Sequence, residues 1–339
     1  MPSYLDDKAF VDFVLEKGSI PFLVRGSLVC SANFNFIPFV GIRVSGPTYH
    51  VHAIGENPGK PEDTGVIYVH ELNDEAVFPG EIELAEKTKL GISKALNCLE
   101  LWADFLCLAV GNPKIVIEVQ RPINAVITTR SNLDSRAFNK WGTLSENYLQ
   151  LETSDRRKLA GAMWWYRKAC TAVYYSLFDS YTAYWNCLEI LCNVSGSKVH
   201  KGSNVNNAIQ QYLKSKTKIK PGHIQHCYNN FVNYSIKEQM KDALKVIMGE
   251  EQAVQAIYQC FEVKPEKDRL YQIRNDINHG NIRENSGRDY ERVRYRGMLL
   301  WNIVMELLHK KLGHSISMGM SINALADKLA NPAFRNGES

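Results

Sequence analysis

Several features that would settle a protein's class at once are missing from this sequence. Its longest apolar stretches, Leu101–Val110 and Met298–Leu308, are shorter than the roughly 18 residues that a membrane-spanning helix needs, and each contains an acidic residue. The N-terminus is acidic, with Asp6 and Asp7, where an export signal would be basic and then apolar. We therefore expect a cytoplasmic protein that does not associate with a membrane.

The usual sequence signatures of bound cofactors are also missing. None of the eight cysteines belongs to a Cys-x-x-Cys pair, and without an export signal we expect reduced thiols. No Gly-x-x-x-x-Gly-Lys-Ser/Thr loop is present, which argues against ATP binding of the P-loop type. The motifs His50-x-His52 and His223-x-x-His226-Cys227 lack convincing partner ligands, so we expect no metal and no cofactor.

Length and charge predict two domains of different character. At 339 residues the chain exceeds what one hydrophobic core usually holds. The net charge of +4 is unevenly distributed: residues 1–150 carry 13 Lys and Arg against 18 Asp and Glu, and residues 151–339 carry 27 against 18. The basic half suits a polyanion such as nucleic acid, although scattered solvated lysines would give the same count.

Residues 1–145 predict a β-rich domain. A short amphipathic helix is expected at Lys8–Lys17, followed by strands that Gly-, Pro- and Asn-containing segments separate. The expected strands are Phe22–Cys30, Phe36–Val44, Thr48–Ile54, Val66–Leu72, Lys114–Gln120 and Ala125–Arg130. One long helix should run from Pro79 to about Val110, where Gly111 follows.

Residues 150–315 predict an all-α bundle, and residues 316–339 a tail with one short helix at Ile322–Leu329. One continuous helix, Arg156–Asn193, is expected because its aromatic and apolar residues recur at steps of four and three. These residues are Tyr174, Phe178, Tyr181, Trp185 and Leu188. Further helices are expected at Ser235–Met248, Gln252–Cys260, Glu266–His279 and Asp289–Leu312. The fold class is therefore α+β, a β-rich domain followed by a helical bundle.

A short motif near the end of the bundle carries the functional prediction. It reads Arg269-Leu270-Tyr271-Gln272-Ile273-Arg274-Asn275-Asp276-Ile277-Asn278-His279-Gly280, an Arg-x4-His pattern with a polar residue beside the arginine and a glycine that closes the helix. It resembles the signature of the HEPN superfamily, in particular the Apea-like branch found in prokaryotic defence proteins. The segment Tyr184–Leu191, in which Glu189 stands among apolar residues, is similar to an earlier helix of that family.

The residue types in this motif suit RNA cleavage without a metal. On a helix, Asn275 and His279 share a face, and Arg274 flanks that face by about 100°. RNA carries its own nucleophile, the 2′-OH, so a cut needs a group that moves a proton near neutral pH and a fixed cation for the charge on the phosphorane. Histidine and arginine suit these tasks, and Asn275 would orient the imidazole or hold the phosphate. We expect these three residues to be catalytic.

Two further expectations concern RNA binding and assembly. Arg283, Arg288 and Arg292 follow the motif closely enough to bind phosphates, although a solvated helix face paired with acidic neighbours explains them equally well. An aromatic cluster upstream fits a core or a dimer interface better than a base-stacking surface. The cluster comprises Trp164, Trp165, Tyr166, Tyr174 and Tyr175. The resemblance implies a homodimer through the helical domain, with two motifs facing each other across a two-fold axis.

The resemblance thus predicts a metal-independent HEPN endoribonuclease that cleaves RNA through attack by the 2′-OH, as a prokaryotic defence or stress effector. Such an enzyme must be restrained, and the acidic N-terminal domain is the natural regulator, responding to a phage or cellular trigger. The alternative is a non-catalytic HEPN module that serves as a dimerisation or RNA-binding scaffold. The two differ in whether Arg274 and His279 face an open cleft.

Overall fold

The structure is a computed structural model. It describes residues 6–28, 42–44, 75–111, 115–120, 124–133, 135–193, 198–199, 211–212, 215, 233–234, 236–284 and 286–314. Some expected features lie outside these residues. They are the strands Thr48–Ile54 and Val66–Leu72, the helix Ile322–Leu329, and the motifs His50-x-His52 and His223-x-x-His226-Cys227.

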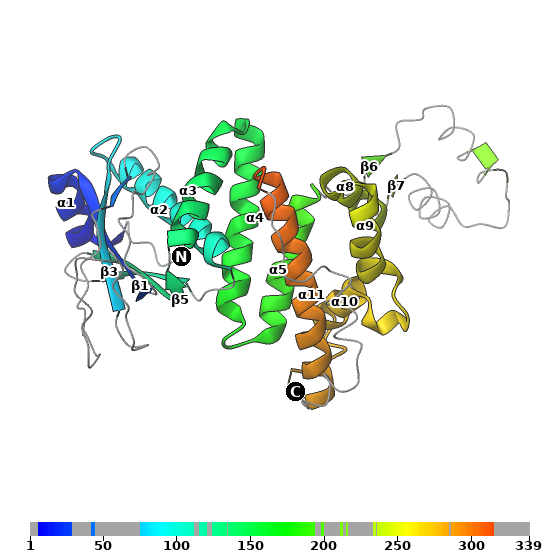
Figure 1. Ribbon diagram of the computed structural model, residues 1–339. Coiled ribbons are helices and arrows are strands. Elements are labelled where there is room, and N and C mark those ends of the chain that lie inside the picture. The colour runs from blue at the N-terminus through cyan, green and yellow to red at the C-terminus, as the bar shows by residue number, and fades with distance from the viewer. Residues whose placement is uncertain are drawn as a thin grey trace, which may run out of the picture.

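A five-stranded mixed sheet forms the N-terminal unit (Figure 1). Its strands are β1 (Ser19–Leu28), β2 (Ile42–Val44), β3 (Glu75–Glu83), β4 (Ile115–Gln120) and β5 (Asn124–Leu133). Their order is β2-β3-β1-β5-β4; β1 runs antiparallel to β3 and parallel to β5, and the two outer strands are antiparallel to their neighbours. The parallel pair needs a crossover connection, and this connection contains helix α2 (Lys89–Val110).

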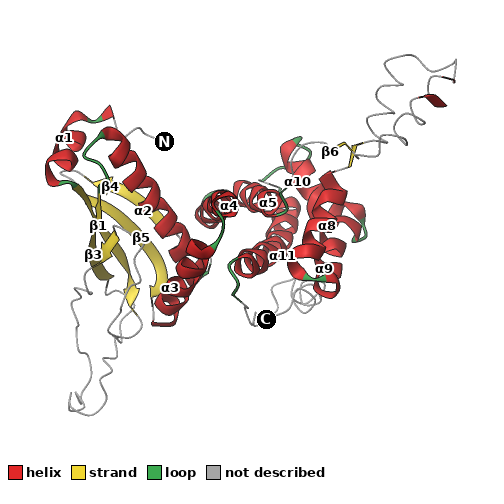
Figure 2. Ribbon diagram, turned by 90° about the horizontal axis from the view of Figure 1, so that it is seen from above, coloured by secondary structure: helices red, strands yellow, loops and turns green. Residues whose placement is uncertain are grey.

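Two helices of the N-terminal unit pack against this sheet, and a third packs on α2. Helix α1 (Lys8–Lys17) begins at Asp7, whose carboxylate accepts two backbone N–H groups, and ends at Gly18 in the left-handed conformation. Helix α2 lies along the sheet (Figure 2), where Trp102 contacts Phe22 of β1 with ring centroids 5.2 Å apart. Trp102 also contacts Trp141 of α3 (Ser135–Gln150), at 4.0 Å.

The predictions for this unit are confirmed in part. The sheet is present, as are the helix α1, the strands β4 and β5, and the end of α2 at Val110. The predicted helix start at Pro79 is wrong, because Pro79 lies in β3 opposite Leu23. Strand β2 pairs with residues 80–82 of β3, so Pro79 stands just beyond the stretch that β2 covers. Helix α3 was not predicted, and it spans residues 135–150.

The remainder of the described chain is mostly helical (Figure 1), which confirms the α+β class. Its helices are α4 (Thr153–Ala172), α5 (Leu177–Leu191), α8 (Ile236–Met248), α9 (Glu250–Ile257), α10 (Leu270–Asn278) and α11 (Gly287–Lys311). A π-helical turn at Tyr258–Glu262 and a 3-10 turn at Glu266–Asp268 lie between α9 and α10. The short strands β6 (Lys198–Val199) and β7 (Asn233–Tyr234) pair with each other. Within the part of the chain described above, no helix has both the length and the apolar character to cross a membrane.

The predicted continuous helix Arg156–Asn193 is wrong, because the chain turns a corner between α4 and α5. Ser176 caps α5 by accepting a hydrogen bond from the N–H of Asp179 at 3.1 Å. The expected buried face survives within α5, where Phe178, Tyr181, Trp185 and Leu188 are buried. Tyr174 falls in the corner and is 51% exposed. A serine three residues before an acidic residue is a capping signal that the apolar periodicity concealed.

An ion pair buried at the junction joins the sheet unit to the helical part. Nε of Arg167 on α4 donates a hydrogen bond to Oδ1 of Asp104 on α2, and Nη2 of Arg167 lies 3.6 Å from Oε2 of Glu100. Burial raises the pKa of Asp104 to about 7, although Arg167 acts against this rise. Burial also disfavours the charge on Arg167, but Asp104 and Glu100 outweigh it and raise the pKa of the guanidinium. The arginine therefore stays charged.

His309, near the end of α11, is fully buried at the same junction. Neither imidazole nitrogen has a hydrogen-bond partner among the described residues, and the ring of His314 lies 5.4 Å away between centroids. Burial, followed by the nearby charges of Lys140 on α3 and His314, lowers the pKa of His309 to about 3; the backbone of Leu108 on α2 opposes this shift. His309 is thus a neutral imidazole at neutral pH.

Candidate active site

The Arg274–His279 motif occupies the short helix α10 and its C-terminal end. Leu270 and Ile273 are fully buried and fix the helix, and Tyr181 of α5 donates a hydrogen bond to the carbonyl of Leu270 at 2.9 Å. His279 is the C-cap of the helix. Gly280 follows with φ +68°, a conformation that favours glycine, so the predicted helix end is confirmed.

Arg274 is held between two side chains. Its Nη2 lies 3.4 Å from Oε1 of Glu189 on α5, and its Nη1 donates a hydrogen bond to Oδ1 of Asn275 at 3.2 Å. The same oxygen of Glu189 accepts a hydrogen bond from Nε1 of Trp185 at 2.7 Å. Glu189 therefore helps to hold the guanidinium of Arg274 next to the side chain of Asn275. The Arg274 side chain remains 28% exposed, so this cation can still meet a ligand from solvent.

His279 is exposed one turn beyond Asn275. Its backbone N–H donates to the carbonyl of Asn275 at 2.9 Å, which keeps the two residues on consecutive turns. Within the described residues the imidazole makes no hydrogen bond and no ion pair. The structure thus brings Arg274 and Asn275 into contact and leaves His279 beside them, accessible and without a side-chain bond to either.

The loop that follows His279 is attached to the start of α5. Glu284 accepts hydrogen bonds from the backbone N–H groups of Leu177 and Phe178, at 2.7 and 3.5 Å, and from the hydroxyl of Ser176 at 3.3 Å. A carboxylate suits this place because a helix N-terminus carries partial positive charge and unpaired N–H groups. Helix α5 therefore supports both sides of the candidate site, through Glu189 and through this loop.

Arg292 makes contacts within the protein itself, and its predicted role in RNA binding does not explain them. Its side chain is 16% exposed, and Nη2 bonds Asp276 at 2.9 Å and the carbonyl of Lys267 at 2.6 Å. Asp268 and Asp289 lie 3.8 and 4.0 Å from its other nitrogens. Arg292 thereby ties α11 to α10 and to the turn before it. The alternative to RNA binding, an arginine paired with acidic neighbours, therefore fits Arg292. Arg292 is not a candidate RNA contact.

Arg283 and Arg288 differ from Arg292, since both side chains are exposed. Neither guanidinium is paired with another residue in the described ranges. Arg283 belongs to the loop that Glu284 anchors, and Arg288 stands in the first turn of α11. Both remain available to bind phosphates.

Glu189 is the residue to which the sequence analysis gave no role. Its signal was present, because a carboxylate on a buried helix face needs a hydrogen-bonding or cationic partner. That the partner is Arg274, 85 positions later in the chain, follows only from the packing of α10 against α5. Glu284 gave no comparable signal, since its capping contact is made 106 to 108 positions away.

Comparison with protein-family models, with curated proteins and with solved structures gave no match. The function is therefore inferred from the residues and their geometry. In the described residues no three His, Cys, Asp or Glu side chains are grouped so as to hold a metal ion. Burial raises the pKa of Cys192 to about 12 and that of Cys187 well above its ordinary value, so neither thiol is a ready nucleophile.

The aromatic cluster upstream of the motif divides into core and surface. Tyr166 is fully buried, and its hydroxyl accepts a hydrogen bond from Nε1 of Trp301 at 3.1 Å. Trp164 is half-buried, and the Lys168 ammonium lies 3.7 Å from its ring centroid. Tyr175, at the α4–α5 corner, is 73% exposed. Of these five residues Tyr166 alone belongs to the core, and the other four keep surface that a dimer interface could cover.

Proposed function

We propose that this protein is a metal-independent endoribonuclease of the HEPN type. The observation that carries the proposal is the Arg274–Asn275 pair, fixed by Glu189, beside the exposed His279 at the end of α10. A site for RNA cleavage needs a fixed cation and an accessible group that moves protons, and this helix end offers both. In this proposal Glu189 acts through Arg274 and is a positioning residue.

The chemistry follows from the RNA itself. The 2′-OH loses its proton and attacks the adjacent phosphorus, the bond from phosphorus to the 5′-oxygen breaks, and that oxygen takes up a proton. The products carry a 2′,3′-cyclic phosphate and a 5′-OH. Arg274 would stabilise the phosphorane charge, and in a homodimer the two His279 side chains would serve as base and acid.

The sheet unit is the proposed regulator, sensing a phage or cellular trigger in the cytoplasm. Helix α2 of this unit packs on α4, where Asp104 bonds Arg167, and α4 packs on α5, which carries Glu189. A trigger that displaces α2 therefore acts on Glu189 through two packed helices. Coupling between distant sites travels through such packed elements when they have two arrangements.

A non-catalytic HEPN scaffold is the second candidate, and one observation favours it. Arg274 is paired with Glu189, and its Nε is buried without a hydrogen-bond partner in the described residues. An arginine engaged in this way also fits a purely structural role. A scaffold of this class would bind RNA or dimerise, and would leave RNA intact.

The decisive experiment incubates the purified protein with total RNA in EDTA. We expect cleavage by the unmodified protein and none by His279→Ala, because the exposed imidazole supplies proton transfer and little packing. Asn278→Ala is the matched control, since Asn278 is an exposed neighbour in the last turn of α10. RNA with 2′-O-methyl groups should resist, because its nucleophile is blocked.

The outcomes separate the two candidates. If His279→Ala cuts as fast as the unmodified protein, the catalytic assignment is wrong. If the unmodified protein binds RNA without cutting it, the scaffold is the better description. Glu189→Gln adds a test of positioning: it should lower the cleavage rate while RNA binding through Arg283 and Arg288 persists.

A further inference from the structure

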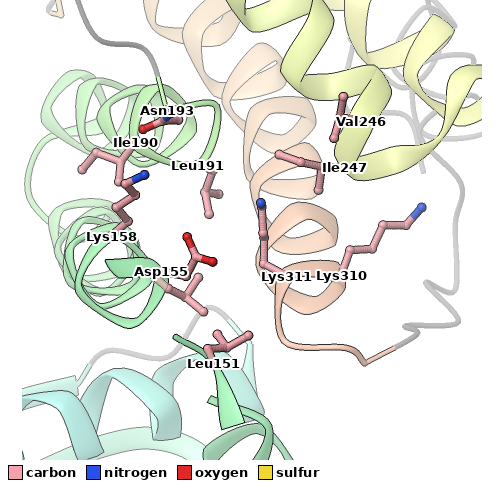
Figure 3. A pocket seen from close by; sticks show the side chains of 11 residues that line it. Leu151, Asp155, Lys158, Ile190, Leu191, Asn193, Val246, Ile247, Lys310 and Lys311 are labelled. Atoms are coloured by element: carbon pink, nitrogen blue, oxygen red, sulfur yellow. The ribbon is translucent and has the colours of Figure 1, made fainter. Parts of the chain in front are cut away.

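A cavity of about 490 Å³ lies among four helices of the helical part, at the start of α4 and the ends of α5, α8 and α11 (Figure 3). None of the predicted site residues lines it. Its lining combines apolar side chains, among them Leu159, Leu191 and Ile247, with charged groups on α4 and α11. This combination of apolar area and a few charges is typical of small-molecule sites.

The charges in this cavity are mostly positive and without partners. Lys158 of α4 and Lys311 of α11 line it on opposite sides (Figure 3). Neither ammonium is bonded to another residue in the part of the chain that the structure describes. Asp155 of α4 is the acidic residue of the lining and is likewise without a partner among the described residues. Two cations against one anion leave this space positive.

Lys310 lines the same cavity but is already engaged. Its ammonium donates hydrogen bonds to the carbonyl of Met248, at 2.8 Å, and to the side chain of Gln252, and it lies 3.6 Å from Glu306. Figure 3 shows it directed away from Lys158 and Lys311. The contrast indicates that Lys158 and Lys311 are the two cations available to a ligand.

The apolar part of the cavity is also incompletely covered. Val246 of α8 lines it and is 84% exposed, and the neighbouring Ile247 and Ile190 are partly buried. Covering such side chains with an apolar ligand removes their surface from water, at about 25 cal/mol per Å². A ligand that contacted only the lysines would leave these apolar side chains in water and would not gain this free energy.

We propose that this cavity binds a small amphipathic anion, an organic molecule with an apolar body and one carboxylate, sulfonate or phosphate group. The acidic group would lie between Lys158 and Lys311, and the body against Leu159, Leu191 and Ile247. The volume falls within the roughly 300–1,000 Å³ of small-molecule pockets. Asp155 lowers the affinity for the anion and so restrains binding of simple polyanions. This site goes beyond the proposed nuclease and does not depend on it.

Two dyes of nearly equal shape test the proposal by equilibrium fluorescence titration. 1-Anilinonaphthalene-8-sulfonate carries an aromatic body and one sulfonate, and N-phenyl-1-naphthylamine is the same body without the charge. We expect the sulfonate dye to bind more tightly to the unmodified full-length protein. Lys158→Ala and Lys311→Ala should each weaken its binding about fivefold, as expected for a partly exposed ion pair, and leave the neutral dye unaffected. Asp155→Asn should strengthen binding of the sulfonate dye, because it removes the negative charge of the cavity lining.

Two further variants keep the test decisive. Lys89→Ala, an exposed lysine at the start of α2, controls for the general loss of positive charge and should change neither titration. Val246→Trp should displace both dyes, because a larger side chain at this exposed position occupies the apolar space. The proposal is overturned if neither dye binds, if both respond alike to the lysine variants, or if Lys89→Ala weakens the sulfonate dye as much as Lys158→Ala.

Discussion

Replacing His309 by leucine should make the protein more resistant to acid. The imidazole is fully buried between α11, α2 and α3, and both its nitrogens lack hydrogen-bond partners among the described residues. The titratable groups that face it are Lys140 of α3 and His314, and both disfavour a second positive charge there. Leucine is uncharged, apolar and of similar size, so His309→Leu removes the buried proton acceptor and fills its place.

The magnitude follows from the two pKa values. His309 titrates at an ordinary value of 6.5 in the unfolded chain and at about 3 in the folded protein. Between these values the unfolded state binds more protons, so the stabilising contribution is complete above pH 6.5 and is lost as the pH falls toward 3. From about pH 7.5 to about pH 5 the free energy of unfolding should fall by about 2 kcal/mol through this residue, or roughly 3 °C in Tm for a chain of 339 residues.

Thermal unfolding followed by circular dichroism at both pH values measures this effect. In His309→Leu the loss of stability between the two pH values should shrink by about 2 kcal/mol relative to the unmodified protein. His279→Ala is the matched control, because it removes an exposed histidine in place of a buried one. If His309→Leu loses as much stability in acid as the unmodified protein, the buried imidazole is not held neutral and the reasoning fails.

Three other predictions concern the candidate site and its assembly. Arg292→Ala should lower the free energy of unfolding by about 3 kcal/mol in urea denaturation, because it removes the cationic partner of Asp276, whereas Arg288→Ala should stay within about 0.5 kcal/mol. Equal losses would contradict the distinction between them. Gly280→Ala should cost about 1 kcal/mol by the same measurement, since its φ of +68° is strained for other residues, and an unchanged stability would refute this. Light scattering at micromolar concentration should give twice the chain mass, and a strict monomer that cleaves RNA would exclude a site shared across a two-fold axis.

Local signals in the sequence were sufficient where an element is determined by its own residues. Helix α1 has a capping aspartate and a terminal glycine, and α8 and α11 have clear apolar periodicity, so their positions were predictable. The start of α2 was misplaced because the acidic residues before it, Glu81 and Glu83, suit a helix N-terminus as well as a strand. Whether this segment forms a helix or a strand depends on the residues that pair with Pro79 in the sheet. Those residues are distant from it in the sequence.

The candidate site shows the same difference between local signals in the sequence and contacts that depend on distant residues. The placement of Arg274, Asn275 and His279 at one helix end follows from their spacing, and the contact between Arg274 and Asn275 agrees with it. The roles of Glu189 and Glu284 depend on which helices pack together, as does the engagement of Arg292 by three carboxylates. Long-range pairing of this kind leaves no periodicity in the sequence, so a count of arginines could not separate Arg292 from Arg288.

The ion pair between Arg167 and Asp104 limits how freely the halves of this protein can be exchanged. A helical half joined to a foreign sensor would present a largely buried guanidinium with no acid opposite it, at a cost of about 3–5 kcal/mol. Recombination between relatives would therefore succeed only where the incoming helix also places a carboxylate at the position of Asp104. The two halves are accordingly expected to pass through evolution as a matched pair, in which a change in one surface selects for a compensating change in the other.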